Sequence, residues 1–205
     1  VFTSLDVPVN EYGLQYPDQP VLCGPGDPKE GTDIARFVGD QIAAVVAETE
    51  EAAAKGRDLI EIQFEELPVV TDPRDALEPG APVLHPAYPG TPIHPELVFE
   101  GNVASHHRIR KGDVDAVWDQ AAVVIEAEYE IPGQEHAFLQ PEAAVAYIDE
   151  EERVTIIAST QWIHEDCRQI AHALGLPEER VRIILPAIGG AFGGKEDLSV
   201  QIVAA

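Results

Sequence analysis

The sequence is poor in cysteine and in long apolar runs, and it contains no methionine. Its two cysteines, Cys23 and Cys167, are too few for a disulfide framework or for a four-thiolate zinc or iron–sulfur site. No apolar run approaches the roughly 20 residues that span a bilayer, which excludes a membrane span. This cysteine usage is typical of reducing compartments, so we expect a cytoplasmic protein.

Basic residues are also scarce. Lys and Arg total 13 against 37 Asp and Glu, which leaves a formal net charge of -24. Such a field repels phosphate backbones and anionic membrane surfaces, so nucleic acid and membranes are excluded as expected partners. The 205 residues, of which 45% are hydrophobic, are enough to bury a sizeable core.

The two ends of the chain lack the usual signals of a complete domain. Residues 1–5 have no signal-peptide pattern and predict a strand entered midway. Residues 198–205 predict a helix or strand that stops without glycine, proline or polar closure. We therefore expect a piece of a longer polypeptide; a processed chain with an unusual terminus would show the same pattern.

The first structural unit predicted from the pattern covers residues 37–66. An apolar run at 42–47 predicts a strand, acids followed by alanines at 48–55 predict a helix, and alternation at 59–64 predicts a second strand. Prolines then recur at 73, 79, 82, 86, 89, 92 and 95, which predicts an irregular connector over about residues 72–112.

The second unit begins at Asp113, which can cap a short helix that runs through Trp118. Apolar residues at helical spacing predict a helix over 162–174, ended by Gly175. Strands are predicted at 122–131, 143–148, 153–158 and 181–185, with an acidic turn at 149–152. The whole pattern indicates a mixed α/β (α+β) fold.

A glycine-rich loop follows the last of these strands. Gly189-Gly190-Ala191-Phe192-Gly193-Gly194-Lys195-Glu196 lets backbone N–H groups approach a ligand without obstruction. Its spacing fits the core of a phosphate-binding P-loop, but Glu196 stands where that motif needs Ser or Thr. A nucleotide-phosphate site, a structural turn and a cofactor or substrate site all stay open on this pattern alone.

Three ordered motifs resemble a known family. They are Gly-Gln-Glu-His-Ala-Phe-Leu-Gln-Pro-Glu at 133–142, Ser-Thr-Gln at 159–161 and the glycine loop at 189–196. Their order and spacing are similar to those of the molybdenum hydroxylases, the xanthine dehydrogenase and aldehyde oxidase family. Residues 37–47 and 64–68 resemble the small hammerhead domain of the same family.

The resemblance implies an architecture. It predicts a partial α/β hammerhead domain over residues 1–78, a proline-rich connector over 79–112, and the first lobe of a molybdopterin-binding domain over 113–205.

The resemblance also implies site residues. Gln161 is expected to hydrogen-bond an oxygen on molybdenum, with no direct protein ligand to the metal. Gly190, Ala191, Phe192 and Gly193 are expected to contact the cofactor, the last two through backbone N–H groups. Glu196 is expected to contact the substrate, and it favours a purine-like molecule because aldehyde oxidases commonly carry an apolar residue there.

The activity that the resemblance implies belongs to a longer parent protein. That protein would hydroxylate a purine, another N-heterocycle or an aldehyde with oxygen from water. It would pass electrons to 2Fe-2S clusters and FAD on other domains or subunits, and we expect it to be an oligomer. The catalytic glutamate is expected downstream, so this chain is expected to hold no catalytic residue and to be inactive alone.

Two other functions stay open from the residues. One is a non-catalytic anion- or nucleotide-binding module built on Gly189–Lys195, and the other is a scaffold that docks partner subunits. We expect His136 to be a packed structural residue and Cys167 to be a small core residue. The remaining connector histidines, His85, His94, His106 and His107, lack the spacing of a zinc site.

Overall fold

The computed structural model describes residues 1–14, 17–86, 101–103 and 109–205. The chain divides into two units, one of residues 1–67 and 136–205 and the other of residues 68–135. Three of the connector histidines, His94, His106 and His107, lie outside the described residues, as do the connector prolines at 89, 92 and 95. No helix in the described part of the chain is long and apolar enough to cross a membrane.

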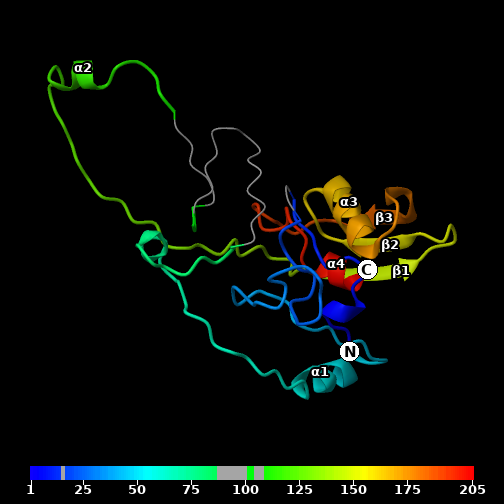
Figure 1. The fold of residues 1–205 in the computed structure, drawn as a ribbon. Helices are drawn as coiled ribbons and strands as arrows, with labels where there is room; N and C mark the ends of the chain where they lie inside the picture. Colours follow the sequence, from blue (N-terminus) through cyan, green and yellow to red (C-terminus); the bar gives the residue numbers. More distant parts are fainter. Residues whose placement is uncertain (15–16, 87–100, 104–108) are drawn as a thin grey trace. The chain divides into compact units, whose positions relative to one another are not determined.

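The first unit is built on a three-stranded sheet of β1 (Ala144–Ile148), β2 (Val154–Ala158) and β3 (Val181–Ile184), in that order across the sheet. β1 runs antiparallel to β2, and β3 runs parallel to β2 (Figure 1). All three strands fall where the apolar pattern predicts them.

The turn between β1 and β2 is held by the side chain of Asp149. Its Oδ1 accepts hydrogen bonds from the backbone N–H groups of Glu151 (2.9 Å) and Arg153 (3.0 Å). Its Oδ2 accepts from Nε of Arg153 (3.0 Å) and from Oγ1 of Thr155 (2.9 Å). These contacts, the backbone of Arg153 first, lower the pKa of Asp149 to about 2. The acidic turn predicted at 149–152 is therefore a fixed connection between two strands.

Two helices cover the sheet. α3 (Ile163–Leu174) connects β2 to β3 and packs against β3, and α4 (Val200–Ala204) packs against β1 and β2. α3 confirms the helix predicted from apolar spacing, and it ends at Gly175, whose left-handed backbone (φ +65°) stops the helix.

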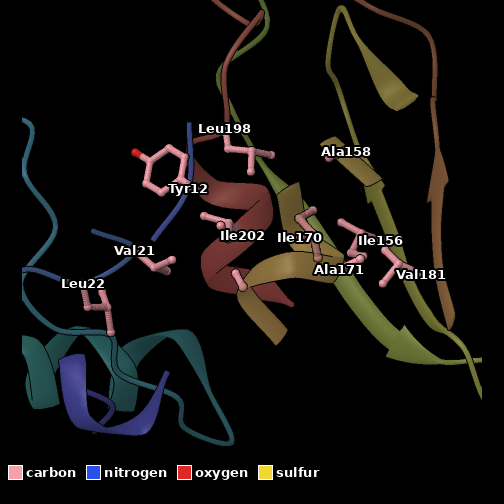
Figure 2. Packing of buried hydrophobic residues seen from close by; sticks show 11 residues of the cluster. Tyr12, Val21, Leu22, Ile156, Ala158, Ile170, Ala171, Val181, Leu198 and Ile202 are labelled. Atoms are coloured by element: carbon pink, nitrogen blue, oxygen red, sulfur yellow. The ribbon is translucent and has the colours of Figure 1, made fainter. Parts of the chain in front are cut away.

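The core lies between the sheet, these two helices and the N-terminal segment (Figure 2). Its buried side chains include Tyr12, Val21, Leu22, Ile156, Ala158, Ile170, Ala171, Val181, Leu198 and Ile202. Two hydrogen bonds tie the N-terminal segment to α3: the N–H of Val9 donates to the carbonyl of Ala173, and the N–H of Gly13 donates to Oε1 of Gln169, both at 2.9 Å. The start of the chain is thus part of the unit that carries the glycine loop.

Three strands predicted near the start of the chain are not formed. The segments predicted as strands at 1–5 and 42–47 pair only through a single antiparallel bridge between Phe2 and Ala44 in the described structure. A short 3-10 helix, η1 (Ser4–Asp6), follows the bridge, and residues 59–64 pair with no strand in the described structure. Those predictions were wrong because a strand needs a neighbouring strand, which alternation alone cannot supply.

The helix predicted between the last two of them is confirmed. α1 (Glu50–Asp58) begins after Thr49, whose Oγ1 accepts a hydrogen bond from the N–H of Ala52 at 3.2 Å.

The second unit carries little regular structure in its described part. It contains the 3-10 helix η2 (Asp75–Leu77) and α2 (Asp115–Trp118). The Oδ1 of Asp113 accepts from the N–H of Ala116 at 3.1 Å, in agreement with the predicted cap. The prediction of a strand at 122–131 is wrong, because this segment has no described strand to pair with.

Candidate functional site

The glycine loop, residues 189–196, adopts backbone conformations that side chains rarely allow. φ is +96° at Gly190, +55° at Phe192 and +93° at Gly193. The N–H of Gly194 donates to the carbonyl of Ala191 at 2.9 Å and closes a turn around Phe192. Phe192 is 77% exposed, so burial of its ring does not offset the energetic cost of its left-handed backbone. A strained, exposed aromatic residue among glycines is typical of a functional loop.

Gln161 is hydrogen-bonded to this loop at three points. It lies shortly after the end of β2, and its Oε1 accepts from the N–H groups of Gly193 (3.1 Å) and Lys195 (3.2 Å). Its own N–H donates to the carbonyl of Lys195 at 2.9 Å. Both neighbours of Oε1 are N–H donors, so the orientation of the amide is fixed. The structure therefore brings Gln161 and the glycine loop together, although they are far apart in sequence.

Two donors at this place remain available. The Nε2 group of Gln161 donates to no acceptor among the described residues, and Gln161 is exposed. The N–H of Phe192 likewise has no acceptor in the described part of the chain. The N–H of Gly193, expected from the sequence to face a ligand, is used by Gln161 instead. Two uncharged donors, one from each segment, are thus available to a ligand of the loop.

A second segment holds the beginning of the loop. The N–H of Gly189 donates to Oε1 of Gln140 at 2.7 Å, and the N–H of Gln140 donates to the carbonyl of Gly189 at 3.3 Å. A Cβ atom on Gly189 would lie 2.6 Å from Cβ of Gln140. The glycine at 189 is therefore required by this close approach.

Lys195 lies beneath the loop. Its side chain is fully buried, and its Nζ donates to the carbonyl of Gln140 (2.9 Å) and to Oγ of Ser159 (3.2 Å). The same Nζ lies 4.3 Å from the centre of the Phe138 ring. The ammonium is therefore turned away from the face that a ligand of the loop would occupy.

Glu196 does not pair with its neighbour Lys195. It is half-buried, and no hydrogen bond or ion pair joins it to another described residue. Its carboxylate is available as an acceptor beside the loop, where the sequence predicts a substrate contact.

Asp166 is a buried carboxylate near Thr160. It lies in the first turns of α3, is 0% exposed, and neither of its oxygens has a hydrogen-bond partner of ordinary geometry in the described structure. Burial raises the pKa of Asp166 to about 6; the nearby Thr160 hydroxyl lowers it in part, while the charges of Asp197 and Glu165 raise it. No motif or spacing in the sequence indicates a role for this residue.

The described residues contain no group of three His, Cys, Asp or Glu side chains placed to hold a metal ion. His136 is exposed, so the packed position expected for it is not found, although a Cβ on Gly194 would lie 3.0 Å from its Nδ1. Cys167 is half-buried, and burial raises the pKa of its thiol, which disfavours a nucleophilic role.

The residues that position Gln161 were not predicted by sequence reasoning. Gln140 belongs to the first motif and Ser159 to the second, so the motifs were the available signal. Nothing in the sequence shows that Lys195 is buried, because a lysine beside a glutamate is usually exposed to solvent.

Comparison with known proteins places the chain in a family. The family model described as the molybdopterin cofactor-binding domain matches residues 94–205. The chain is 38% identical to a probable xanthine dehydrogenase subunit of Bacillus subtilis (strain 168), over 100% of this chain and 25% of the relative. It is 35% identical to the nicotinate dehydrogenase large molybdopterin subunit of Eubacterium barkeri, over 94% of this chain and 40% of the relative.

The fold is also similar to solved structures. The aldehyde oxidoreductase from Desulfovibrio gigas superimposes with a TM-score of 0.80 at 24% sequence identity, over 100% of this chain and 22% of that one. The chain thus spans between about a fifth and two fifths of the length of the proteins named here.

Proposed function

Because the chain belongs to the family of molybdopterin cofactor-binding domains, we propose that it is part of a xanthine dehydrogenase-like molybdenum hydroxylase. The observation that carries this proposal is the fixed amide of Gln161, whose Oε1 is bound by the glycine loop. The proposed substrate is a purine, another nitrogen heterocycle or an aldehyde. Two of the relatives are named as a xanthine dehydrogenase and a nicotinate dehydrogenase, which supports a heterocycle.

The residues present fit an oxygen-bearing cofactor. When bound, the molybdenum–pterin cofactor supplies the oxygen-transfer chemistry and takes up the electron pair of the substrate carbon. Gln161 donates from Nε2 to an oxygen of the cofactor, which an amide can do without adding charge. In the proposal, Phe192 donates its backbone N–H to the same group, and its neighbours Gly190 and Ala191 also contact the cofactor.

Glu196 is the proposed substrate contact. Its carboxylate has no described partner and can accept a hydrogen bond from a ring N–H of a heterocycle. Replacement by valine, Glu196→Val, is expected to raise KM for xanthine or hypoxanthine at least about tenfold and to leave KM for an aromatic aldehyde within about twofold. Equal changes for both substrate classes would contradict this role.

The rest of the enzyme lies outside this chain in the proposal. The catalytic glutamate, the 2Fe-2S clusters and the FAD are expected on other parts of the same polypeptide or on partner subunits of an oligomer. Residues 1–78 are proposed to be most of a hammerhead domain, residues 79–112 a connector, and residues 113–205 the first part of the molybdopterin-binding domain. A cytoplasmic location is proposed from the two free thiols.

A nucleotide-binding module built on Gly189–Lys195 is not favoured. In a P-loop the lysine must reach the phosphates. Here the ammonium of Lys195 is fully buried and bonded to Gln140 and Ser159, and Glu196 would add a negative charge beside phosphate oxygens.

The molybdenum content of the full-length protein, purified with its natural partners from a host that makes the cofactor, tests the proposal. We expect about one molybdenum per subunit. Gln161→Glu keeps the acceptor for Gly193 and Lys195 but removes the Nε2 donor, so kcat is expected to fall about 100-fold. Gln63→Glu, an exposed change outside the site, is the matched control and leaves kcat unchanged. Absence of molybdenum with partners and cofactor synthesis intact would overturn the proposal.

A further inference from the structure

Lys195 is an unusual lysine in this chain. It is 0% exposed, whereas the side chains of Lys29 and Lys55 are 38% and 71% exposed. Lysine is almost never fully buried unless it is paired, because an ammonium loses its hydration when it is buried. Within the described part of the chain, no carboxylate forms an ion pair with Lys195. The burial of this ammonium is therefore compensated by contacts other than an ion pair.

The contacts of the Lys195 side chain join three segments. The ammonium donates to the carbonyl of Gln140, in the segment before β1, and to the hydroxyl of Ser159, directly after β2. The third side of the ammonium faces the ring of Phe138 at 4.3 Å, a favourable cation–π distance. An ammonium has three donors and no acceptor, so it can hold several acceptors around one point.

The backbone of Lys195 extends the same arrangement to Gln161. Its carbonyl accepts from the N–H of Gln161 at 2.9 Å and from Oγ1 of Thr160 at 3.4 Å, and its N–H donates to Oε1 of Gln161. Every residue of the Ser-Thr-Gln motif therefore contacts Lys195. The geometry of Gln161 depends on where this one residue is held.

We infer that Lys195 is a positioning residue: its buried ammonium fixes the glycine loop to the segments before β1 and after β2. In doing so it holds the Nε2 group of Gln161 and the N–H of Phe192 where they can donate to one ligand. The inference rests on the proposed function for the identity of that ligand, but the fixation itself is a property of the protein without cofactor. Fixed donors need no rearrangement when the ligand binds or reacts, which is the basis of electrostatic preorganisation.

Amide hydrogen exchange in the full-length, cofactor-free protein measures the fixation directly. Lys195→Met keeps the length of the side chain but removes both hydrogen bonds and the charge. We expect peptides that cover residues 189–195 to exchange at least about tenfold faster in this variant. Ser159→Ala removes one of the two bonds and is expected to give a smaller increase of about threefold. Lys55→Met, at an exposed position on α1, is the matched control and leaves exchange of the loop unchanged.

Steady-state kinetics of the cofactor-loaded enzyme separate positioning from a general loss of structure. Lys195→Met is expected to lower kcat at least about tenfold and to leave KM within about threefold, because the substrate does not touch the buried ammonium. Molybdenum content per subunit, measured on the same samples, corrects kcat for any loss of cofactor.

The results that overturn the inference are distinct from those that overturn the proposed function. Unchanged loop exchange in folded Lys195→Met, or faster exchange with unchanged kcat, would refute the positioning role. If Lys195→Met does not fold, Ser159→Ala decides: unchanged exchange and kcat refute the role, and a parallel change in both supports it. A wild-type protein without molybdenum would refute the proposed function, while the exchange result would still report on Lys195.

Discussion

Phe192, which has a left-handed backbone, is the most informative single residue of the site. A non-glycine residue at φ +55° costs about 1–2 kcal/mol, and a side chain that is 77% exposed recovers little of this by burial. A Cβ on Gly190 would lie 3.2 Å from Cε2 of Phe192, so the ring lies against the glycine before it. This strained conformation therefore places an aromatic ring and a free N–H at a defined position on the loop.

Phe192→Gly is expected to leave stability within about 1 kcal/mol of the wild type, because relief of strain offsets the flexibility that glycine adds. In the full-length enzyme, kcat per molybdenum is expected to fall at least about tenfold, because the loop loses the conformation that presents its N–H. Thermal unfolding and steady-state kinetics check the two parts. The control is Glu152→Gly, which relieves the same kind of strain (φ +60°) in the β1–β2 turn and leaves kcat unchanged. A large loss of stability in Phe192→Gly alone would contradict the strained, exposed position.

Asp166 determines a pH dependence of stability. Its pKa is about 6 in the folded chain against an ordinary value of 3.8, so between these values the folded state binds more protons than the unfolded state. Stability therefore falls as pH rises from about 4 through about 6, and the loss is complete by about pH 7. Burial is the main cause, because a charged carboxylate with no bonded partner is costly in the core.

Asp166→Asn removes this titration. The variant is expected to melt at a higher temperature than the wild type above pH 7, by the equivalent of up to about 3 kcal/mol, and the difference is expected to shrink as pH falls toward 4. Melting temperatures of the full-length protein across this pH range give the measurement. The matched control, Asp58→Asn, changes an exposed carboxylate on α1 and lacks the effect. Equal melting temperatures of Asp166→Asn and wild type at high pH would contradict the assignment.

At the scale of elements, the glycine loop and the segment before β1 are packed so closely that glycine is needed on both sides of Phe192. A Cβ on Gly194 would lie 2.9 Å from Cε1 of Phe138 and 3.0 Å from Nδ1 of His136. The Phe138 ring also faces the ammonium of Lys195, so it cannot move without disturbing that contact. The elements around the site therefore constrain one another.

Gly194→Ala is expected to destabilise the protein by about 1–3 kcal/mol and to reduce the molybdenum content of the full-length protein to less than half, because the new methyl group displaces the loop. Metal analysis and thermal unfolding check this. Gly133→Ala is the control, because a Cβ there meets no atom within 4 Å and its backbone is not left-handed. Equal molybdenum contents in the two variants would show that the close packing is not needed.

At the scale of the whole molecule, many large apolar side chains remain on the surface. In the second unit, Ile125, Tyr129 and Ile131 are 84%, 85% and 89% exposed along a segment rich in β-forming residues. The chain also spans only 25% of the first relative named here. We therefore propose that other parts of the parent protein cover this segment and complete the cofactor site.

The chain produced by itself is expected to retain no molybdenum above background and to show no turnover, because two donors, one on the glycine loop and one on Gln161 after β2, are too few contacts for a cofactor of this size. Metal analysis of the isolated chain beside the full-length protein from the same host makes the comparison. About one molybdenum per isolated chain would contradict the expectation and would show that the residues described here suffice.

The local sequence determined the elements whose signals are local. Periodic apolar residues with a glycine stop predicted α3, acids followed by alanines predicted α1, and apolar, β-forming runs on either side of an acidic turn predicted β1 and β2. The motifs also named Gln161 and the glycine loop, because sequence order and spacing are enough to indicate a family. The family match bears out that indication.

Only the tertiary structure decided what depends on distant partners. The strands predicted at 42–47, 59–64 and 122–131 do not form, because pairing is a property of two segments and alternation describes one. The burial of Lys195 and Asp166 is likewise invisible in the sequence. Lys195 is held by a carbonyl 55 positions earlier in the chain, and such a contact exists only once the loop, the segment before β1 and the end of β2 have folded together.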